Sequence, residues 1–200
     1  SEDLFLHHYK SLRDGTISMV AGGITEKYNT NIDCAIGKFV KLTATPLRGF
    51  HKEGQKEVDH AGGGNFSIKK NIYKEVGGVD EHLTKGAALY EETDICLRVR
   101  RAGYKIYYNH KAHMYHLAAK TGGCREPDIH RYVYSLSRNR TIIIHRYLPW
   151  YYRNTAHIYL FKLVLAYIKG YRDTSLYKSY LKGKREGKKI ALKPILNTSN

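Results

Sequence analysis

Cysteine and acidic residues are scarce in this 200-residue chain, and each shortage excludes a class of protein. The three cysteines, Cys34, Cys96 and Cys124, are odd in number and form no CxxC pair, so a disulfide-stapled secreted domain is not indicated and a cytosolic, reducing compartment is favoured. Asp and Glu total 18 against 34 Lys and Arg, which gives a net charge of +16. A surface of this charge attracts phosphates, nucleotides, nucleic acid or anionic lipid.

Long apolar runs are lacking as well. Residues 1–20 contain no basic stretch followed by an apolar core, so no signal peptide is predicted. The most apolar segment, 158–168, is too short to span a bilayer and is interrupted by Lys162. We therefore predict a cytoplasmic protein, with peripheral attachment to the cytoplasmic face of a membrane as the alternative.

The composition, 42% hydrophobic and 26% charged, is typical of a folded globular chain. Hydrophobic patterning and turn residues predict helices over 2–13, 31–42, 70–76 and 91–102, strands over 17–20, 66–68, 104–108 and 112–117, and an exposed loop over 44–57. Later segments read as long helices, at 128–147 and 150–170, followed by a basic segment at 173–189. The alternation predicts an α/β domain over residues 1–126 and a helical, basic extension over 127–200.

The helix predicted over 91–102 has the sharpest chemical pattern. Glu92 lies in line with Ile95 and Val99 on the face predicted to be buried. Asp94 and Arg98 share the opposite face, which is predicted to be solvated, and can pair at i, i+4. Two interpretations of Glu92 stay open: an acid that opposes the helix dipole in a first turn, or a general base that a substrate hydroxyl can reach.

Four segments occur in a recognisable order. They are 63–70 (GGNFSIKK), 76–81 (VGGVDE), the acidic helix that ends RAGY at 101–104, and a later helix with Tyr134 and SRNR at 137–140. This order resembles that of family 2 glycosyltransferases, which have a GT-A fold and use nucleotide-sugar donors. The resemblance covers roughly residues 1–150. It implies that residues 1–126 are the acceptor-side part of a GT-A catalytic domain, and that residues 127–200 form a helical extension.

The resemblance also implies roles for single residues. In the family an acid removes the proton from the acceptor hydroxyl, which then attacks the anomeric carbon with inversion. Glu91 and Glu92 stand where the family has Glu-Asp, which implies that Glu92 is the catalytic base, although its extra methylene shifts the carboxylate. The implied substrate-binding residues are Gly63, Gly64, Asn65, Glu91 and Arg138.

Each of these assignments has a plainer alternative. Glycines at 62–64 permit close backbone approach and positive φ, but also form ordinary turns. Arg138 and Arg140 could reach a diphosphate, or lie on a solvated basic face. The resemblance places His116 near the metal or diphosphate, whereas a packed histidine is the alternative.

His110, His113 and His116 do not read as three ligands of one metal ion. Strand alternation puts only His110 and His116 on one face, and no spaced cysteine pair accompanies them.

Two motifs of the family do not occur in this chain. No Asp-x-Asp motif is present, and residues 1–4 (SEDL) resemble the sequence just after it. The resemblance thus implies a divalent metal, Mg²⁺ or Mn²⁺, whose ligands lie mostly in a preceding N-terminal part, and little or no sugar transfer by these 200 residues alone. No Gln-x-x-Arg-Trp occurs, so a processive synthase is not indicated. The implied partners are a nucleotide-sugar donor and a glycan or lipid-linked acceptor of cell-envelope glycan biosynthesis.

Residues 145–200 contain 12 Lys and Arg, eight Tyr and only two acids. Ile158, Phe161, Leu165 and Ile168 form one apolar stripe of the predicted helix, with lysines beside it. This pattern suits an anionic membrane surface, and suits packing on the catalytic domain equally well. A module that stacks nucleic-acid bases on tyrosines is the alternative from another class. No RRM, KH or zinc-finger signature occurs, so no specific nucleic acid is predicted.

Overall fold

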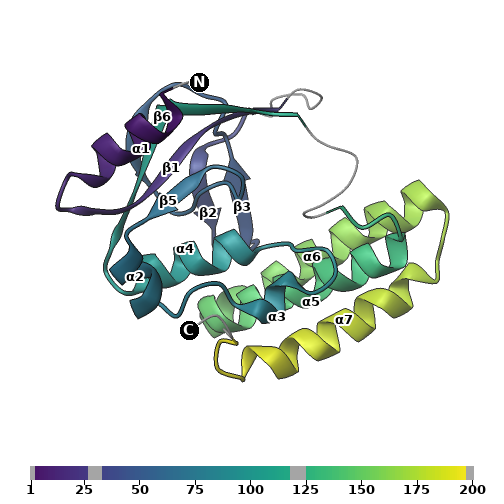
Figure 1. The fold of residues 1–200 in the computed structure, drawn as a ribbon. Helices are drawn as coiled ribbons and strands as arrows, with labels where there is room; N and C mark the ends of the chain where they lie inside the picture. Colours follow the sequence, from purple (N-terminus) through teal and green to yellow (C-terminus); the bar gives the residue numbers. More distant parts are fainter. Residues whose placement is uncertain (1–2, 27–32, 118–124, 197–200) are drawn as a thin grey trace. The chain divides into compact units, whose positions relative to one another are not determined.

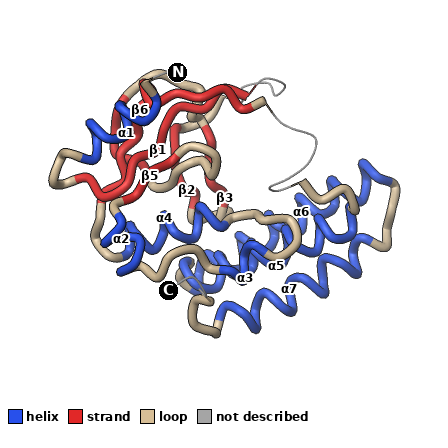
Figure 2. The backbone as a smooth tube through the Cα atoms, in the orientation of Figure 1, coloured by secondary structure: helices blue, strands red, loops and turns tan. Residues whose placement is uncertain are grey.

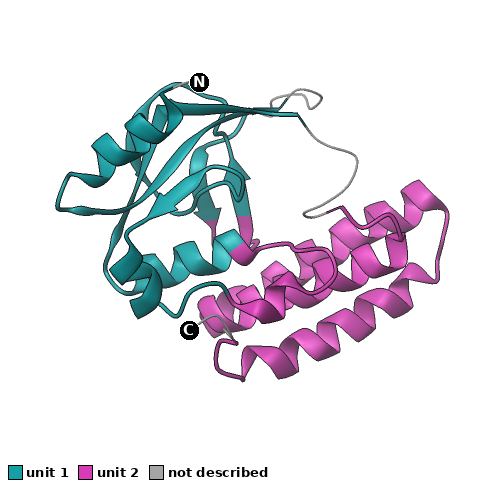
Figure 3. Cartoon of the chain, in the orientation of Figure 1, with its two compact units in different colours: residues 1–39, 46–79, 92–119 teal, residues 40–45, 80–91, 120–200 magenta. Residues whose placement is uncertain are grey.

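The computed structural model describes residues 3–26, 33–117 and 125–196. The chain forms two compact units, one of residues 1–39, 46–79 and 92–119 and one of residues 40–45, 80–91 and 120–200 (Figure 3). It is a mixed α/β protein, with a four-stranded mixed sheet and a small second sheet followed by three C-terminal helices (Figures 1 and 2). The domain boundary predicted after residue 126 falls near the start of the longest segment of the second unit.

The main sheet of the first unit has the strand order β4-β6-β1-β5. Its strands are β1 (Ile17–Glu26), β4 (Gln55–Val58), β5 (Phe66–Ile68) and β6 (Lys105–His116). Strand β1 pairs in parallel with β6 and antiparallel with β5, and β4 pairs antiparallel with β6. Strands β2 (Ile36–Val40) and β3 (Thr45–Arg48) form the second sheet.

Strand β6 replaces the two strands predicted over 104–108 and 112–117. Its register against β1 jumps between Asn109 and His113, so residues 110–112 bulge out of the ladder. Asn65 holds this bulge, because its side-chain amide donates to the carbonyls of Gly23 and Ala112 at 2.9 and 2.8 Å. The break in pattern at 109–111 is therefore a bulge within one strand and not a turn between two.

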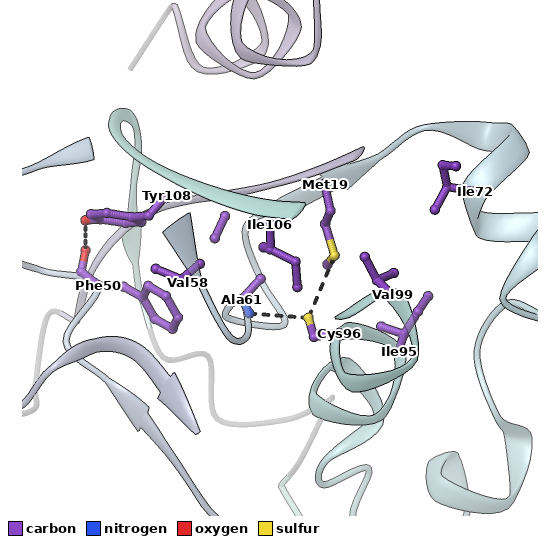
Figure 4. Packing of buried hydrophobic residues seen from close by; sticks show 11 residues of the cluster. Met19, Phe50, Val58, Ala61, Ile72, Ile95, Cys96, Val99, Ile106 and Tyr108 are labelled. Carbon is purple, nitrogen blue, oxygen red and sulfur yellow. Dashed lines mark hydrogen bonds between the residues drawn. The ribbon is translucent and has the colours of Figure 1, made fainter. Parts of the chain in front are cut away.

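Helices α1 (Leu4–Leu12), α2 (Lys70–Glu75) and α4 (Glu91–Arg101) accompany the sheet. The core between α4 and the sheet includes Met19, Ile95, Val99 and Ile106 (Figure 4). Helix α1 contacts β1 and β6 through the face that carries the buried His8. Phe5 of the same helix is exposed.

Two predictions for residues 31–57 are wrong. The helix predicted over 31–42 is replaced by β2, in which Gly37 and Phe39 are buried and Lys38 between them is exposed. Gly37 has φ of 54°, outside the helical region. The loop predicted over 44–57 contains β3 and β4. Strand β4 lies at the edge of its sheet and exposes three polar residues, so its composition resembles that of a loop.

The second unit consists of α3 (Glu81–Thr84), α5 (Ile129–Tyr147), α6 (Trp150–Tyr171) and α7 (Leu176–Ala191). The long helices predicted over 128–147 and 150–170 are confirmed. Helix α7 lies along α5 (Figure 1), and its Gly183 and Gly187 permit the close approach. A Cβ at either glycine would lie 2.4 Å from a carbonyl oxygen of α5. Across the described ranges, none of the helices combines the length and hydrophobicity needed to cross a bilayer.

Candidate functional site

Helix α4 presents Glu92 in its first turn. Ile95, Cys96 and Val99 of the same helix pack into the core of the first unit beside Met19 (Figure 4). Glu92 continues this buried stripe by one turn towards the helix start, and only 7% of it is exposed. The prediction that Glu92 lies in line with the buried face is thus confirmed.

The segment 60–64 is fixed against α4 beside this carboxyl. The backbone N–H of Ala61 donates to Cys96 Sγ at 3.3 Å, and burial raises the pKa of that thiol, which stays protonated (Figure 4). A Cβ at Gly62 would lie 2.5 Å from Ile24 Cδ1, the end of a flexible side chain, so a larger residue here would require Ile24 to move. The close backbone approach predicted for these glycines stays a prediction.

Gly63 lies next to the Glu92 carboxyl. A Cβ at Gly63 would lie 3.4 Å from Glu92 Cδ and 3.7 Å from Oε1, while Gly63 and Gly64 are themselves exposed. None of residues 62–64 has a positive φ, so the conformational reason offered for these glycines is wrong. A Cβ at position 63 would be in ordinary van der Waals contact with the carboxyl, and glycine leaves this side of the carboxyl without a side chain over it.

Arg48 is the charged partner of Glu92. Its Nη2 lies 3.4 Å from Glu92 Oε1, and the arginine side chain is 61% exposed against 8% for the glutamate. Burial raises the pKa of Glu92 above its ordinary value, and the opposing effect of Arg48 is smaller. A carboxyl with a raised pKa takes and returns protons nearer to neutral pH than an exposed one.

His60 connects the two segments that flank this carboxyl. Its ring is buried, with Nδ1 3.1 Å from the carbonyl oxygen of Ala61 and Nε2 3.0 Å from that of Leu47. Burial lowers the pKa of His60, so the ring is neutral and donates to one of the two carbonyls. Because Leu47 precedes Arg48, the histidine helps to position the arginine. Sequence reasoning missed both residues: Arg48 lies in the stretch 44–57, which it treated as a loop, and it assigned no role to His60.

Asn65, predicted to bind substrate, has a full set of partners within its own unit. Besides the bonds to the β-bulge, its Oδ1 lies 2.8 Å from His8 Nε2, and His8 Nδ1 lies 2.8 Å from Ser67 Oγ. Its backbone N–H donates to Gly62 at 3.1 Å, and its carbonyl accepts from Gly22 at 2.9 Å. Asn65 therefore holds α1, the bulge and the glycine segment together.

Glu91 and Arg138 belong to the second unit. Glu91 is half-buried at the start of α4. Arg138 is 4% exposed, and its guanidinium donates to Asn139 Oδ1 at 2.9 Å and to the carbonyl of Lys85. Arg140 is 5% exposed and donates to the carbonyl of Thr43. The alternative of a solvated basic face is wrong for both arginines. Substrate binding by Glu91 and Arg138 stays a prediction.

Asp94 and Arg98 form the predicted i, i+4 pair, at 2.8 Å between Nη2 and Oδ2. The pair is buried and not solvated: Asp94 is fully buried and Arg98 is 9% exposed. Arg98 also donates to the carbonyls of Val76 and Gly78. The face of α4 that carries Asp94 and Arg98 is therefore covered by the turn that follows α2.

His116 lies at the end of β6, with Nδ1 3.4 Å from Glu26 Oε2. The described residues contain no group of three or more His, Cys, Asp or Glu that could hold a metal ion. Glu26 and His116 offer two ligands, fewer than Mg²⁺ or Mn²⁺ requires, so these residues do not fit a complete site. The bulge at 110–112 breaks the alternation that had placed His110 and His116 on one face.

A separate pocket of about 130 Å³ lies between β2 and β4. Its lining consists of residues 35–38 and 56–59, of which four are charged and four are apolar or glycine. Glu92 is not part of this lining, so the pocket and the Glu92 carboxyl are two different features of the first unit.

Comparison with the models of known protein families gives no match, and comparison with curated protein sequences gives none either.

Proposed function

We propose that this chain is the acceptor-side part of an inverting glycosyltransferase of the GT-A, family 2 type, with Glu92 as its catalytic base. The observation that carries the proposal is the buried carboxyl of Glu92, which has a raised pKa and lies beside the exposed Gly63. The order of segments from residue 63 to residue 140, which resembles that family, supports the reaction class. The substrates would be a nucleotide-sugar donor and a glycan or lipid-linked acceptor.

In this mechanism the acceptor hydroxyl approaches Glu92 past Gly63. Its proton passes to a Glu92 carboxyl oxygen as the hydroxyl oxygen bonds to the anomeric carbon of the donor. The bond from that carbon to the diphosphate breaks at the same time, so the sugar is transferred with inversion. Arg48, 3.4 Å from Oε1, opposes the effect of burial on the Glu92 pKa and so favours the ionised carboxylate that acts as the base.

The donor side is not built from the described residues. A divalent ion would neutralise the diphosphate leaving group when bound, but the pair Glu26–His116 does not make a site for it, so no step is assigned to a metal here. Arg138 is proposed as a substrate contact only on the resemblance, because its Nε and Nη2 donate to groups of its own unit.

The decisive experiment replaces Glu92 by Gln in the protein purified at its native length from its own cells. Transfer from a panel of labelled nucleotide sugars to membrane lipid and glycan acceptors is measured. We expect Glu92→Gln to lower transfer by about 100-fold or more. Glu57→Gln is the matched control, because it removes a carboxylate of the same unit that pairs with Arg100 at the surface. Equal transfer by both variants would rule out the base role.

A second measurement is independent of the donor. Carbon-detected NMR titration of the Glu92 side chain should give a pKa above its ordinary value of 4.5, and Arg48→Gln should raise it further. A Glu92 pKa at or below 4.5 would contradict the electrostatic basis of the proposal.

A further inference from the structure

Helix α6 is apolar on two opposite faces, and only one of them is covered. Ala156, Leu160 and Val164 recur every four residues and are fully buried. Leu160 and Val164 pack with residues of α5 and α7 in the core of the second unit. This inner face accounts for the attachment of α6 to its neighbours.

The opposite side of the helix is exposed although much of it is apolar. We call it the outer α6 face and define it as Tyr151, Ile158, Lys162, Leu165 and Lys169, which recur at spacings of 7, 4, 3 and 4 residues. Ile158 is 54% exposed and Leu165 is 44% exposed. The stripe predicted from the sequence is thus divided, since Phe161 and Ile168 are half-buried against the core.

The charge around this face has one sign. Helix α6 contains no Asp or Glu. The two acids of residues 145–200 are engaged elsewhere: Asp173 lies 2.9 Å from His130 Nε2, and Glu186 accepts from Tyr134. Lys162 and Lys169 lie one turn to either side of Leu165. An occupant of this face must therefore tolerate aliphatic side chains at its centre and supply negative charge at its edges.

We propose that the outer α6 face lies in the headgroup region of an anionic lipid surface, with the helix parallel to the membrane plane. Ile158 and Leu165 would enter the acyl boundary, while the lysine stems extend to the phosphates. Trp150 and Tyr151 begin the helix and are exposed, which suits the interfacial depth that these side chains prefer. A single-stranded nucleic acid would use the lysines and tyrosines but would leave both aliphatic side chains in water.

This binding is independent of the proposed chemistry, because it involves no residue assigned to sugar transfer. Trp150 is the only tryptophan and is 78% exposed, so its emission reports directly on the start of α6. The whole chain is titrated with phosphatidylcholine vesicles that contain or lack phosphatidylglycerol. We expect a blue shift and co-flotation with the anionic vesicles, and at least a tenfold weaker response to neutral ones.

Substitutions distinguish binding through the outer α6 face from attraction by the overall positive charge of the chain. Ile158→Asn combined with Leu165→Asn should weaken binding to anionic vesicles at least tenfold, and Lys162→Gln about fivefold. The matched control is Leu181→Asn on α7, where an equally exposed leucine lies outside the face. Circular dichroism verifies that each variant is folded.

Three results would overturn the proposal. They are no vesicle binding by the wild-type chain, equal binding by the double variant and the Leu181→Asn control, and Trp150 emission that stays unchanged on bound vesicles. Binding of single-stranded RNA without any vesicle binding would replace the lipid by a nucleic acid.

Discussion

The buried pair Asp94–Arg98 makes a strong prediction about the stability of the first unit. Arg98 donates to Asp94 Oδ2 through Nε at 2.9 Å and to the carbonyl of Gly78 at 2.6 Å. The first bond lies within α4, and the second joins α4 to the turn after α2. Asp94→Asn keeps the shape of the side chain and an acceptor oxygen, but leaves the guanidinium without its counter-charge.

The burial of the pair decides the size of the effect. A solvated i, i+4 pair contributes about 0.3–0.5 kcal/mol. Removing one partner of a buried pair costs about 3–5 kcal/mol, because the remaining charge is desolvated and uncompensated. Asp94 is fully buried, so the second figure applies. Since a domain is stable by about 5–15 kcal/mol, Asp94→Asn should remove a large share of its stability.

Urea unfolding at neutral pH, followed by circular dichroism, measures this loss. Glu57→Gln is the matched control, because Glu57 and Arg100 form an ion pair with side chains 43% and 33% exposed, and its loss should cost under about 1 kcal/mol. Asp94→Leu combined with Arg98→Met should recover much of the lost stability, since no buried charge remains. If Asp94→Asn costs no more than Glu57→Gln, the reasoning from burial is refuted.

Three further predictions concern other groups. Gly187→Ala would place a Cβ 2.4 Å from the carbonyl oxygen of Arg138, so it should lower the free energy of unfolding in urea by about 1–3 kcal/mol. Gly170→Ala is the control: open space surrounds this glycine, and alanine should stabilise α6 by up to about 1 kcal/mol. Equal effects of the two substitutions would contradict the close packing of α5 and α7. Burial lowers the pKa of His157 from 6.5 to about 3. Between pH 6.5 and about 3 the unfolded chain therefore binds a proton that the folded chain does not, so the free energy of unfolding should decrease as the pH is lowered. The decrease should be less than about 1.4 kcal/mol per pH unit, because the residue is only half-buried. An unchanged pH dependence of stability in His157→Gln would refute this. Cys96 is buried and its thiol pKa is raised, so it should react with a thiol reagent only after unfolding. Labelling of a Cys34→Ser, Cys124→Ser variant under native and denaturing conditions measures this. Rapid labelling of the native protein would show that the thiol is accessible.

The sequence pattern within a short window predicted those helices and strands whose type is determined by their own residues. Helix α4 and the long helices α5 and α6 are predicted from the residues within each segment, and their bounds agree with prediction to within one residue. Strand β4 was not predicted, because three of its four residues are polar and exposed and therefore resemble a loop. An edge strand is defined by pairing with a distant partner, here residues 106–109 of β6, and pairing of this range leaves no mark in a short window.

The candidate site shows the same division. Glu92 could be predicted because its place in a helical stripe follows from spacing alone. Arg48 and His60 could not, because Arg48 contacts the carboxyl from β3, far away in the sequence, and His60 is connected to it only through the carbonyl of Leu47. The solvated face assigned to Asp94 failed for a related reason: a helical pattern gives the direction of each side chain but not which faces another segment covers.

The net charge of +16 is divided between two uses that composition alone cannot separate. In the second unit Arg138, Arg140 and Arg146 are almost fully buried and donate to backbone carbonyls or to the buried Asp80. The planar guanidinium suits this task, since it satisfies several acceptors at once. Lys162 and Lys169, by contrast, are exposed on the outer α6 face. An anionic partner that meets the outer α6 face therefore contacts ammonium groups on long flexible stems, which follow a fluid lipid surface more readily than they define a fixed diphosphate site.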